Sequence, residues 1–252
     1  MTRRALVTGA ASGLAAGIAP LLARDEFSHI AITYRDTPPH ETLRAIEAAG
    51  AQASAERVAF TDDDAAISAA LDALIARCGP FDTLVHAVGP LVVKRFARLT
   101  MDDYREMFDG NMRSAVLAAQ AVLPAMREAK FGRLIFFGMN GSSETRPYRG
   151  FTLHQAAKSA VVAFARCLAL EEAPKGITVN VIEPGDIRDK AVTRSEALKR
   201  EAGSPRGRPG SFEDVADIVR FLAAPERDYL TGAVISITGG LMEAAERIAP
   251  PR

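Results

Sequence analysis

Short apolar segments alternate with stretches of helical periodicity along almost the whole chain, and this alternation limits the fold more than any other feature. The expected strands are residues 4–8, 29–34, 52–60, 81–88, 133–137, 177–182 and 234–237. The expected helices are residues 13–24, 41–49, 63–77, 101–130 and 151–173, the fourth with a bend near Gly110. Several strands are apolar on both faces, which is typical of a parallel sheet covered by helices on both sides. The pattern predicts a doubly wound α/β fold with a mainly parallel, seven-stranded sheet.

The length and the charge balance limit the kinds of protein that this chain can be. A chain of 252 residues fits one large α/β domain, and the Gly- and Pro-rich stretch 203–210 is too short to link two domains. We therefore expect a single domain over residues 1–252. The 31 basic and 31 acidic residues balance, so neither nucleic acid nor an anionic membrane is expected as a partner.

Targeting and metal-binding patterns are the next features to consider. The chain has no apolar run of about 18 residues, which a membrane span requires, and its first residues lead directly into a strand without a signal-peptide pattern. Cys78 and Cys167 lie far apart and lack metal-ligand spacing, so no metal site is expected. These features favour a cytoplasmic location.

The first expected strand is followed by a glycine-containing turn and then by a helix. The turn reads Thr8-Gly9-Ala10-Ala11-Ser12-Gly13-Leu14. Glycines in this place let the backbone come close to a pyrophosphate, and the helix N-terminus presents free N–H groups to it. The turn therefore predicts a dinucleotide site of the Rossmann type, with Gly9, Ser12, Gly13 and Leu14 at the cofactor.

This turn resembles the TGxxxGxG motif of the short-chain dehydrogenase/reductase family, with Gly9 and Gly13 matching and Ala15 replacing the third glycine. The resemblance covers nearly the whole chain and is closest to 3-oxoacyl-[acyl-carrier-protein] reductases. It implies that Asn111 is the active-site asparagine and that Pro184, Gly185 and Ile187 lie beside the nicotinamide. It also implies cofactor contacts at Ala87 and Gly89, which stand in the family's NNAG segment; the sequence here is His86-Ala87-Val88-Gly89. His86 is open to two interpretations, a cofactor contact or a hydrogen-bonded structural histidine.

The choice of dinucleotide depends on the end of the second expected strand, which reads Thr33-Tyr34-Arg35-Asp36. An arginine there pairs with the 2′-phosphate of NADP, whereas an acidic residue binds the ribose hydroxyls of NAD. Arg35 favours NADP over NAD, although Asp36 follows it directly. The family's adenine-contacting aspartate position holds Ala59.

The family's catalytic motif, YxxxK, is changed in this chain to His154-Gln155-Ala156-Ala157-Lys158. In the family the tyrosine donates a proton to the substrate oxygen, while the lysine lowers the pKa of that tyrosine and holds the nicotinamide ribose. The resemblance implies these roles for His154 and Lys158, whose spacing puts them on one helix face. The family serine position falls on Met139 or Gly141, depending on the alignment, and Ser142 lies nearby.

Four alternatives remain open for the missing tyrosine. His154 replaces it as proton donor, although Lys158 and an oxidised nicotinamide would both lower the pKa of the imidazole. Alternatively, Tyr148 supplies the proton while Ser142 polarises the carbonyl. A tyrosine seven residues before the lysine, as in some enoyl reductases, is replaced here by Phe151. In the fourth alternative the site binds dinucleotide with little or no catalysis, and the protein acts as a regulatory or structural subunit.

The sequence as a whole favours an NADP-preferring oxidoreductase that reduces a small carbonyl substrate, with acyl thioesters among the candidates. The family resemblance implies a homotetramer or dimer in which the helix over 151–173 packs between subunits. The apolar positions that favour this packing are Val161, Val162, Phe164 and Leu168. The charged segment 186–210 is expected to form a substrate lid.

Overall fold

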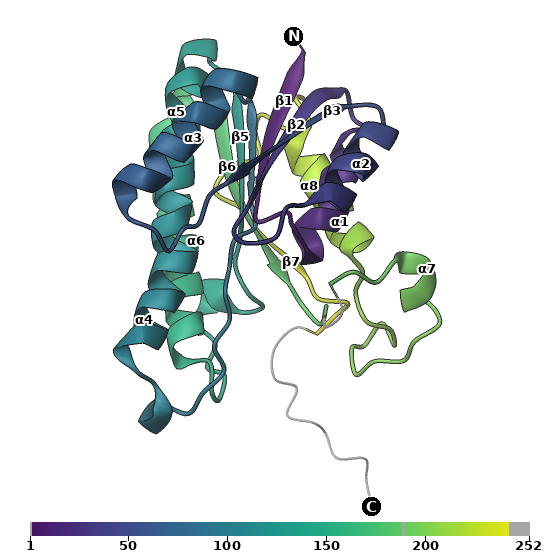
Figure 1. Cartoon of the computed structure of the whole chain (residues 1–252). Helices are drawn as coiled ribbons and strands as arrows, with labels where there is room; N and C mark the ends of the chain where they lie inside the picture. Colours follow the sequence, from purple (N-terminus) through teal and green to yellow (C-terminus); the bar gives the residue numbers. More distant parts are fainter. Residues whose placement is uncertain (1, 188–189, 242–252) are drawn as a thin grey trace, which may run out of the picture.

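The computed structural model describes residues 2–187 and 190–241, and they form one parallel sheet between two layers of helices (Figure 1). The strand order is β3-β2-β1-β4-β5-β6-β7, and all six pairings are parallel. The strands are β1 (Arg3–Thr8), β2 (Phe27–Tyr34), β3 (Gln52–Arg57), β4 (Thr83–His86), β5 (Gly132–Phe137), β6 (Ile177–Pro184) and β7 (Val234–Ile237). This topology confirms the predicted doubly wound fold.

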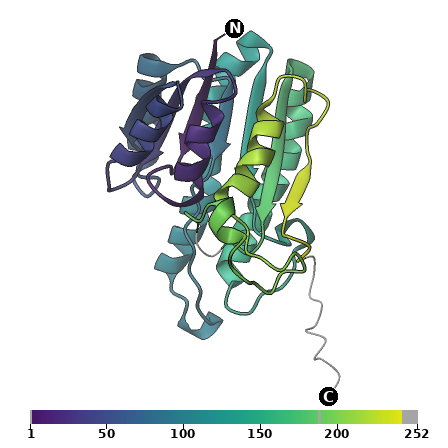
Figure 2. The same cartoon turned by 90° about the vertical axis from the view of Figure 1, so that its right-hand side faces the viewer.

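The helices divide between the two faces of the sheet (Figures 1 and 2). One layer holds α3 (Asp64–Cys78), α4 (Met101–Phe108), α5 (Ser114–Ala129) and α6 (Thr152–Glu172), and the other holds α1 (Gly13–Leu22), α2 (His40–Ala48) and α8 (Phe212–Ala223). Each layer buries its own apolar cluster against the sheet, so the strands are covered on both faces.

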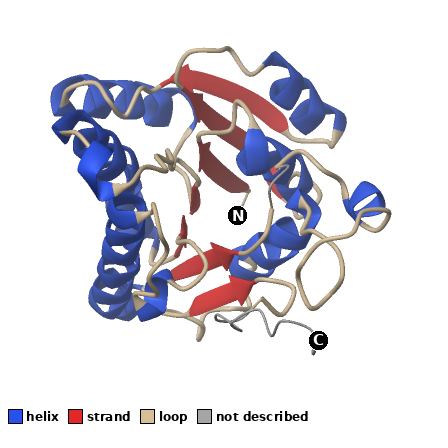
Figure 3. Cartoon of the chain, turned by 90° about the horizontal axis from the view of Figure 1, so that it is seen from below, coloured by secondary structure: helices blue, strands red, loops and turns tan. Residues whose placement is uncertain are grey.

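The loops that follow the strands gather at the carboxyl edge of the sheet, which Figure 3 shows from below. The order of the strands reverses between β1 and β4. In a doubly wound sheet the ligand crevice lies at this switch point, outside the carboxyl ends of the strands. The glycine turn after β1 and the segment after β4 therefore border the expected crevice.

Two expected elements differ in their extent. The long helix expected over 101–130 is divided into α4 and α5 by a π-turn, η2 (Asp109–Arg113), at the place where a bend was expected. The strand expected over 52–60 ends at Arg57, because the chain then turns and Asp62 N donates to Ala59 O at 2.9 Å. The helix α8 was not expected, although Ser211 and Asp214 form a capping box at its start.

The apolar side chains of α6 pack within the chain. Val161, Val162 and Leu168 are buried in the core cluster between α6 and the sheet, and Phe164 packs partly buried against the same cluster. These positions therefore give no support to packing between subunits, because the fold itself covers them, and the oligomeric state stays a prediction. Among the described residues none of the helices has both the length and the apolar character needed to cross a membrane.

The expected lid, 186–210, is described except for residues 188 and 189. It contains a single short helix, α7 (Arg194–Ala197), and lies beside α8. Arg208 pairs with Asp214 of α8 at 2.7 Å, and Arg194 pairs with Asp217 of the same helix at 2.5 Å. Some of the charges that favoured a lid therefore join this segment to the domain.

Candidate active site

The turn after β1 has the backbone conformation that its glycines allow. Gly9 and Gly13 have φ angles of 70° and 68°, a region that favours glycine. The amide of Gly9 donates to Thr33 Oγ1 at 3.1 Å, which ties the turn to the end of β2. Ser12 stands at the N-cap of α1, and its hydroxyl makes no capping hydrogen bond. The free amides at the start of α1 are thus available to an anion.

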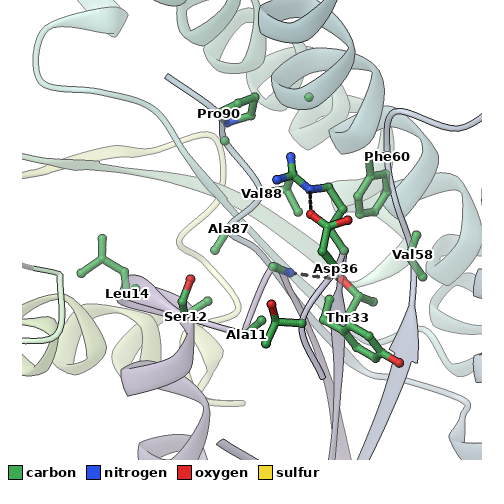
Figure 4. Close-up of a pocket in the computed structure, with 18 of the residues that line it drawn as sticks. Ala11, Ser12, Leu14, Thr33, Asp36, Val58, Phe60, Ala87, Val88 and Pro90 are labelled. Atoms are coloured by element: carbon green, nitrogen blue, oxygen red, sulfur yellow. Dashed lines mark hydrogen bonds and ion pairs between the residues drawn. The ribbon is translucent and has the colours of Figure 1, made fainter. Parts of the chain in front are cut away.

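A cavity of about 530 Å³ lies at this turn, between the ends of β1, β2 and β4 (Figure 4). Its lining includes seven of the predicted cofactor residues: Gly9, Ser12, Gly13, Leu14, Arg35, Ala87 and Gly89. The cavity is open on one side, and Val58 and Phe60 from the segment after β3 form part of its apolar wall. Its position at the switch point and its size suit part of a dinucleotide.

Arg35 and Asp36 both line this cavity and form an ion pair with each other. Arg35 Nε lies 2.5 Å from Asp36 Oδ2, and both side chains are largely exposed. The structure thus brings Arg35 to the wall of the cavity at the end of β2, with the carboxylate of Asp36, which Figure 4 labels, beside it.

Lys190 also lines the cavity, and the sequence analysis did not identify it as a cofactor residue. A Cβ atom added at Gly13 would lie 3.4 Å from Lys190 Cδ, so this lysine crosses from the lid segment to the glycine turn. Its charge is close enough to lower the pKa of both His154 and Lys158. Nothing in the local sequence signals this role, because Lys190 and Gly13 lie 177 positions apart in the chain.

Lys158 and Asn111 meet at Gly89. A Cβ atom added at Gly89 would lie 2.8 Å from Lys158 Nζ and 3.1 Å from Asn111 Oδ1, so a larger residue there would displace these side-chain ends. Lys158 Nζ donates to Phe137 O at 2.9 Å and is buried, and burial together with the charge of Lys190 lowers its pKa to about 7. The structure thus brings together Asn111, Lys158 and Gly89, as the resemblance implied.

Asn111 is held rigidly, yet one of its polar atoms has no partner. Its Nδ2 donates to Met107 O at 2.8 Å and to Pro90 O at 3.2 Å. Its Oδ1 is buried without a hydrogen-bond partner among the described residues. An orphaned buried acceptor is costly unless a ligand or water satisfies it. It therefore marks a place where a bound molecule is expected to donate a hydrogen bond.

His154 lies one helical turn before Lys158, on the same face of α6, and is buried. Its Nδ1 lies 3.1 Å from Pro90 O, the carbonyl that also accepts from Asn111. Burial and the charges of Lys158 and Lys190 lower the pKa of the imidazole to about 4, against the opposing effect of the hydrogen bond to Pro90. His154 and Lys158 thus form a buried pair on this helix and not an exposed surface pair.

The hydroxyl of Ser142, which was predicted to act on the substrate, is engaged in hydrogen bonds within the protein, so its catalytic role stays a prediction. Ser142 Oγ donates to Glu183 Oε1 at 2.8 Å and accepts from Met139 N at 3.1 Å. Glu183, at the end of β6 and 1% exposed, also accepts from Gly141 N and Ser143 N. Counting residues along the loop could not reveal this carboxylate, which lies 41 positions away from Ser142.

The other candidates have structural partners. His86 is buried between Thr8 Oγ1 at 2.9 Å and Ser114 Oγ at 3.0 Å, and burial followed by the charge of Lys158 lowers its pKa to about 3. Of the two interpretations of His86, a cofactor contact or a hydrogen-bonded structural histidine, these contacts favour the second. The hydroxyl of Tyr148 accepts from Arg146, and its ring packs on Phe151 rather than on His154.

The residues expected beside the nicotinamide lie at the end of β6. A Cβ atom added at Gly185 would lie 2.6 Å from Thr238 Cα, so this glycine is required by the close approach of the segment after β7. The side chain of Ile187 is buried in the apolar core. Pro184, Gly185 and Ile187 are not part of the lining of the 530 Å³ cavity, which holds the glycine turn and the end of β2.

These observations fit a dinucleotide. The glycine turn with free helix amides suits a pyrophosphate, Arg35 suits a phosphate at the ribose, and the orphaned Asn111 Oδ1 with Lys158 Nζ suits a hydroxylated group at Gly89. The cations Arg35 and Lys190 lie along the same cavity, where they would neutralise the charges of such a ligand.

The family model described as Enoyl-(Acyl carrier protein) reductase matches residues 9–242. The 3-oxoacyl-[acyl-carrier-protein] reductase FabG of Escherichia coli (strain K12) is 31% identical over 241 residues, which cover 94% of this chain and 96% of that protein. The 3-oxoacyl-[acyl-carrier-protein] reductase MabA of Mycobacterium tuberculosis is 31% identical over 246 residues, 96% of this chain and 93% of that protein.

Solved structures agree with these matches. The acetoin dehydrogenase of Enterobacter cloacae superimposes with a TM-score of 0.87 at 29% identity and covers 99% of both chains. A single-residue variant of the actinorhodin polyketide ketoreductase, solved with NADPH, gives a TM-score of 0.83 at 26% identity, over 95% of this chain and 97% of that one. Sequence and structure thus match the same group of oxidoreductases over nearly the full length.

Proposed function

Since this chain belongs to the short-chain dehydrogenase/reductase family, we propose that it transfers hydride between NADP(H) and a small carbonyl–alcohol pair. The physiological substrate class proposed is a carbonyl compound of the 3-oxoacyl kind, reduced with NADPH. The observation that supports catalysis most directly is the convergence of Lys158 and Asn111 at Gly89, beside a cavity whose size suits part of a dinucleotide.

NADP is proposed in preference to NAD on the position of Arg35. Its guanidinium lines the cavity at the end of β2, where a 2′-phosphate would meet it. The relatives add weight, because one of the similar ketoreductase structures was solved with NADPH. Asp36 pairs with Arg35, and its carboxylate would repel a 2′-phosphate, so the preference for NADP over NAD is expected to be moderate.

The residues of this chain have separable proposed roles. The glycine turn and the N-terminus of α1 hold the pyrophosphate, together with Lys190. Lys158 holds the nicotinamide ribose, and the dinucleotide when bound supplies or accepts the hydride. Asn111 holds Pro90 O in place, and that carbonyl orients His154 toward the substrate oxygen.

A second candidate is a dinucleotide-binding subunit with little or no catalysis. Two observations favour it: histidine replaces the family tyrosine, and the hydroxyl of Ser142 is already donated to Glu183. The burial of Lys158 at Gly89 and the rigid hydrogen bonding of His154 argue for catalysis. We further propose a homo-oligomer and a cytoplasmic location, which rest on the resemblance and on the sequence.

Fluorescence titration of the purified protein with NADPH and NADH tests the cofactor. Absorbance at the reduced nicotinamide band, with 3-oxoacyl thioesters, quinones and simple ketones, tests turnover. We expect tighter binding of NADPH than of NADH, and turnover that Lys158→Ala abolishes. Binding without turnover on every substrate, with turnover gained in His154→Tyr, supports the subunit instead. Failure to bind either dinucleotide refutes both candidates.

A further inference from the structure

Another cavity, of about 410 Å³, lies between the last part of the lid segment, α8 and the edge strand β7. It shares no lining residue with the 530 Å³ cavity, so it is a separate site. Its volume is within the range of small-molecule sites, which is about 300–1,000 Å³. No residue to which a cofactor or catalytic role is assigned lines it.

The floor of this cavity is apolar. Ile235 and Ile237 of β7 and Ile218 of α8 line it, and each of them packs against the core cluster while staying only partly buried. Pro209 of the lid segment adds a fourth apolar surface. An alkyl chain on this floor would cover carbon atoms that now face water, and each methylene buried in this way strengthens binding by about fourfold.

One polar group of the lining is buried without a partner. Thr238, directly after β7, is 8% exposed, and its hydroxyl makes no hydrogen bond to any residue that the structure describes. Its backbone is held closely, because a Cβ atom at Gly185 would lie 2.6 Å from Thr238 Cα. A hydroxyl in such a place is costly unless a ligand or water accepts its hydrogen.

Arg206 brings a positive charge to the same end of the cavity. Its amide donates to Gly239 O at 3.0 Å, and a Cβ atom added at Gly239 would lie 3.4 Å from Arg206 Cβ, so its side chain begins next to the residue after Thr238. The guanidinium is exposed and forms no ion pair with any described residue. A free guanidinium and a free hydroxyl side by side are the donors that a carboxylate accepts from.

The acidic side chains of the lining do not offset this charge. Asp214 accepts two hydrogen bonds from Arg208, at 2.7 and 3.0 Å, and Asp217 pairs with an arginine of the lid segment at 2.5 Å. Asp186 has an interaction partner as well. Of the two arginines in the lining, Arg206 is therefore the one that is left for a ligand.

We propose that this cavity binds a short aliphatic carboxylate, with its alkyl chain on the three isoleucines and its carboxylate between Arg206 and Thr238. The site is separate from the dinucleotide cavity, so the inference does not rest on the proposed function. The ligand would contact the lid segment both at Asp186, where it begins, and at Gly210, where it ends. Binding should therefore stabilise the folded protein and raise its Tm.

Hexanoate, acetate and 1-hexanol test the two halves of the site separately. In isothermal titration calorimetry at constant ionic strength, we expect one hexanoate to bind per chain. Its affinity should be at least about tenfold higher than that of acetate, which lacks the chain, or of 1-hexanol, which lacks the charge. Saturating NADPH should leave the Kd for hexanoate unchanged, because the two cavities share no residue. Loss of hexanoate binding at saturating NADPH overturns the proposal.

Two variants test the polar end of the site. Arg206→Gln and Thr238→Val should each raise the Kd for hexanoate about fivefold and reduce the rise in Tm that hexanoate causes. Lys199→Gln, exposed in the same segment and outside the lining, is the matched control and should change neither value. Arg206 is exposed, so its variant keeps the test valid if Thr238→Val does not fold.

Two results would refute the site. The proposal fails if hexanoate does not bind the wild type, or if Arg206→Gln binds hexanoate as tightly as the wild type does. Sedimentation velocity of the same samples distinguishes a ligand site from a contact between copies of this chain. A change in oligomeric state when hexanoate is added would mean that a second copy covers the cavity, and it would overturn the proposal.

Discussion

Replacing Lys158 by methionine should stabilise the protein while removing its activity. Lys158 is 6% exposed, and burial and the charge of Lys190 lower its pKa from 10.5 to about 7. At pH 7 the unfolded chain keeps this amine charged, so holding it in the folded site costs about 4 kcal/mol at about 1.4 kcal/mol per pKa unit. The lost hydrogen bond to Phe137 O offsets about 1–3 kcal/mol of this gain. We expect a net stabilisation of about 1–3 kcal/mol.

The pH dependence of the stability gives a second, independent test of this prediction. Between pH 7 and 10.5 the unfolded chain binds more protons at Lys158 than the folded protein does, so the stability of the wild type rises with pH. The methionine variant lacks that rise, and its advantage should shrink as the pH approaches 10. Urea unfolding of both proteins at pH 7 and pH 10, without dinucleotide, measures the difference in the free energy of unfolding between variant and wild type at each pH. The reasoning is refuted if the variant is less stable than the wild type at pH 7, or if the difference in their free energies of unfolding does not change with pH.

Five further substitutions test the site and its supports. Arg35→Ala should raise the Kd for NADPH about tenfold with little change for NADH, and Asp36→Asn should lower the Kd for NADPH; both are measured by fluorescence titration. Lys190→Ala should weaken binding of both dinucleotides, and the loss should be smaller at about 1 M salt than at about 0.1 M. Glu183→Ala should destabilise the protein by about 2–4 kcal/mol in urea unfolding, because two buried donors and one partly buried donor lose their acceptor. Acidification from pH 6.5 toward 4 should destabilise the wild type, because the pKa of His86 is lowered to about 3 in the folded protein, whereas the unfolded chain binds the proton. His86→Asn should reduce the pH dependence of the free energy of unfolding in this range by about 1.4 kcal/mol per pH unit.

Matched surface changes separate these effects from a general loss of charge. Lys199→Ala and Arg98→Ala serve as the controls. Lys199 lies in the same segment, 186–210, as Lys190 and is exposed, and Arg98 lies outside the lining of the cavity. Neither change should alter the Kd for NADPH. An effect of Lys199→Ala as large as that of Lys190→Ala would mean that the lid acts through its net charge rather than through contact at the glycine turn.

The fold and the phosphate-binding turn could be predicted from the sequence because they depend on local rules. The apolar strands of a parallel sheet and the positive φ angles of Gly9 and Gly13 leave direct traces in residue type. The same holds for the break near Gly110, where the structure has a π-turn. Residue type alone therefore located the turn that borders the cavity.

The parts that could not be predicted depend on contacts between distant residues. Lys190 approaches Gly13 from a segment far along the chain, and the hydroxyl of Ser142 is engaged by a carboxylate at the end of β6. The burial of Val161 in the core of its own chain likewise depends on how α6 lies on the sheet, which periodicity cannot distinguish from packing between subunits.

The carboxylate of Glu183 has a consequence for engineering. It anchors three consecutive positions of the loop after β5, Gly141, Ser142 and Ser143, and so determines the course of the chain toward His154. Reinstalling the family's serine at Met139 and tyrosine at His154 would leave that anchor in place and the loop in its present path. We therefore expect that restoring the usual chemistry of the family requires exchanging the loop after β5 together with Glu183.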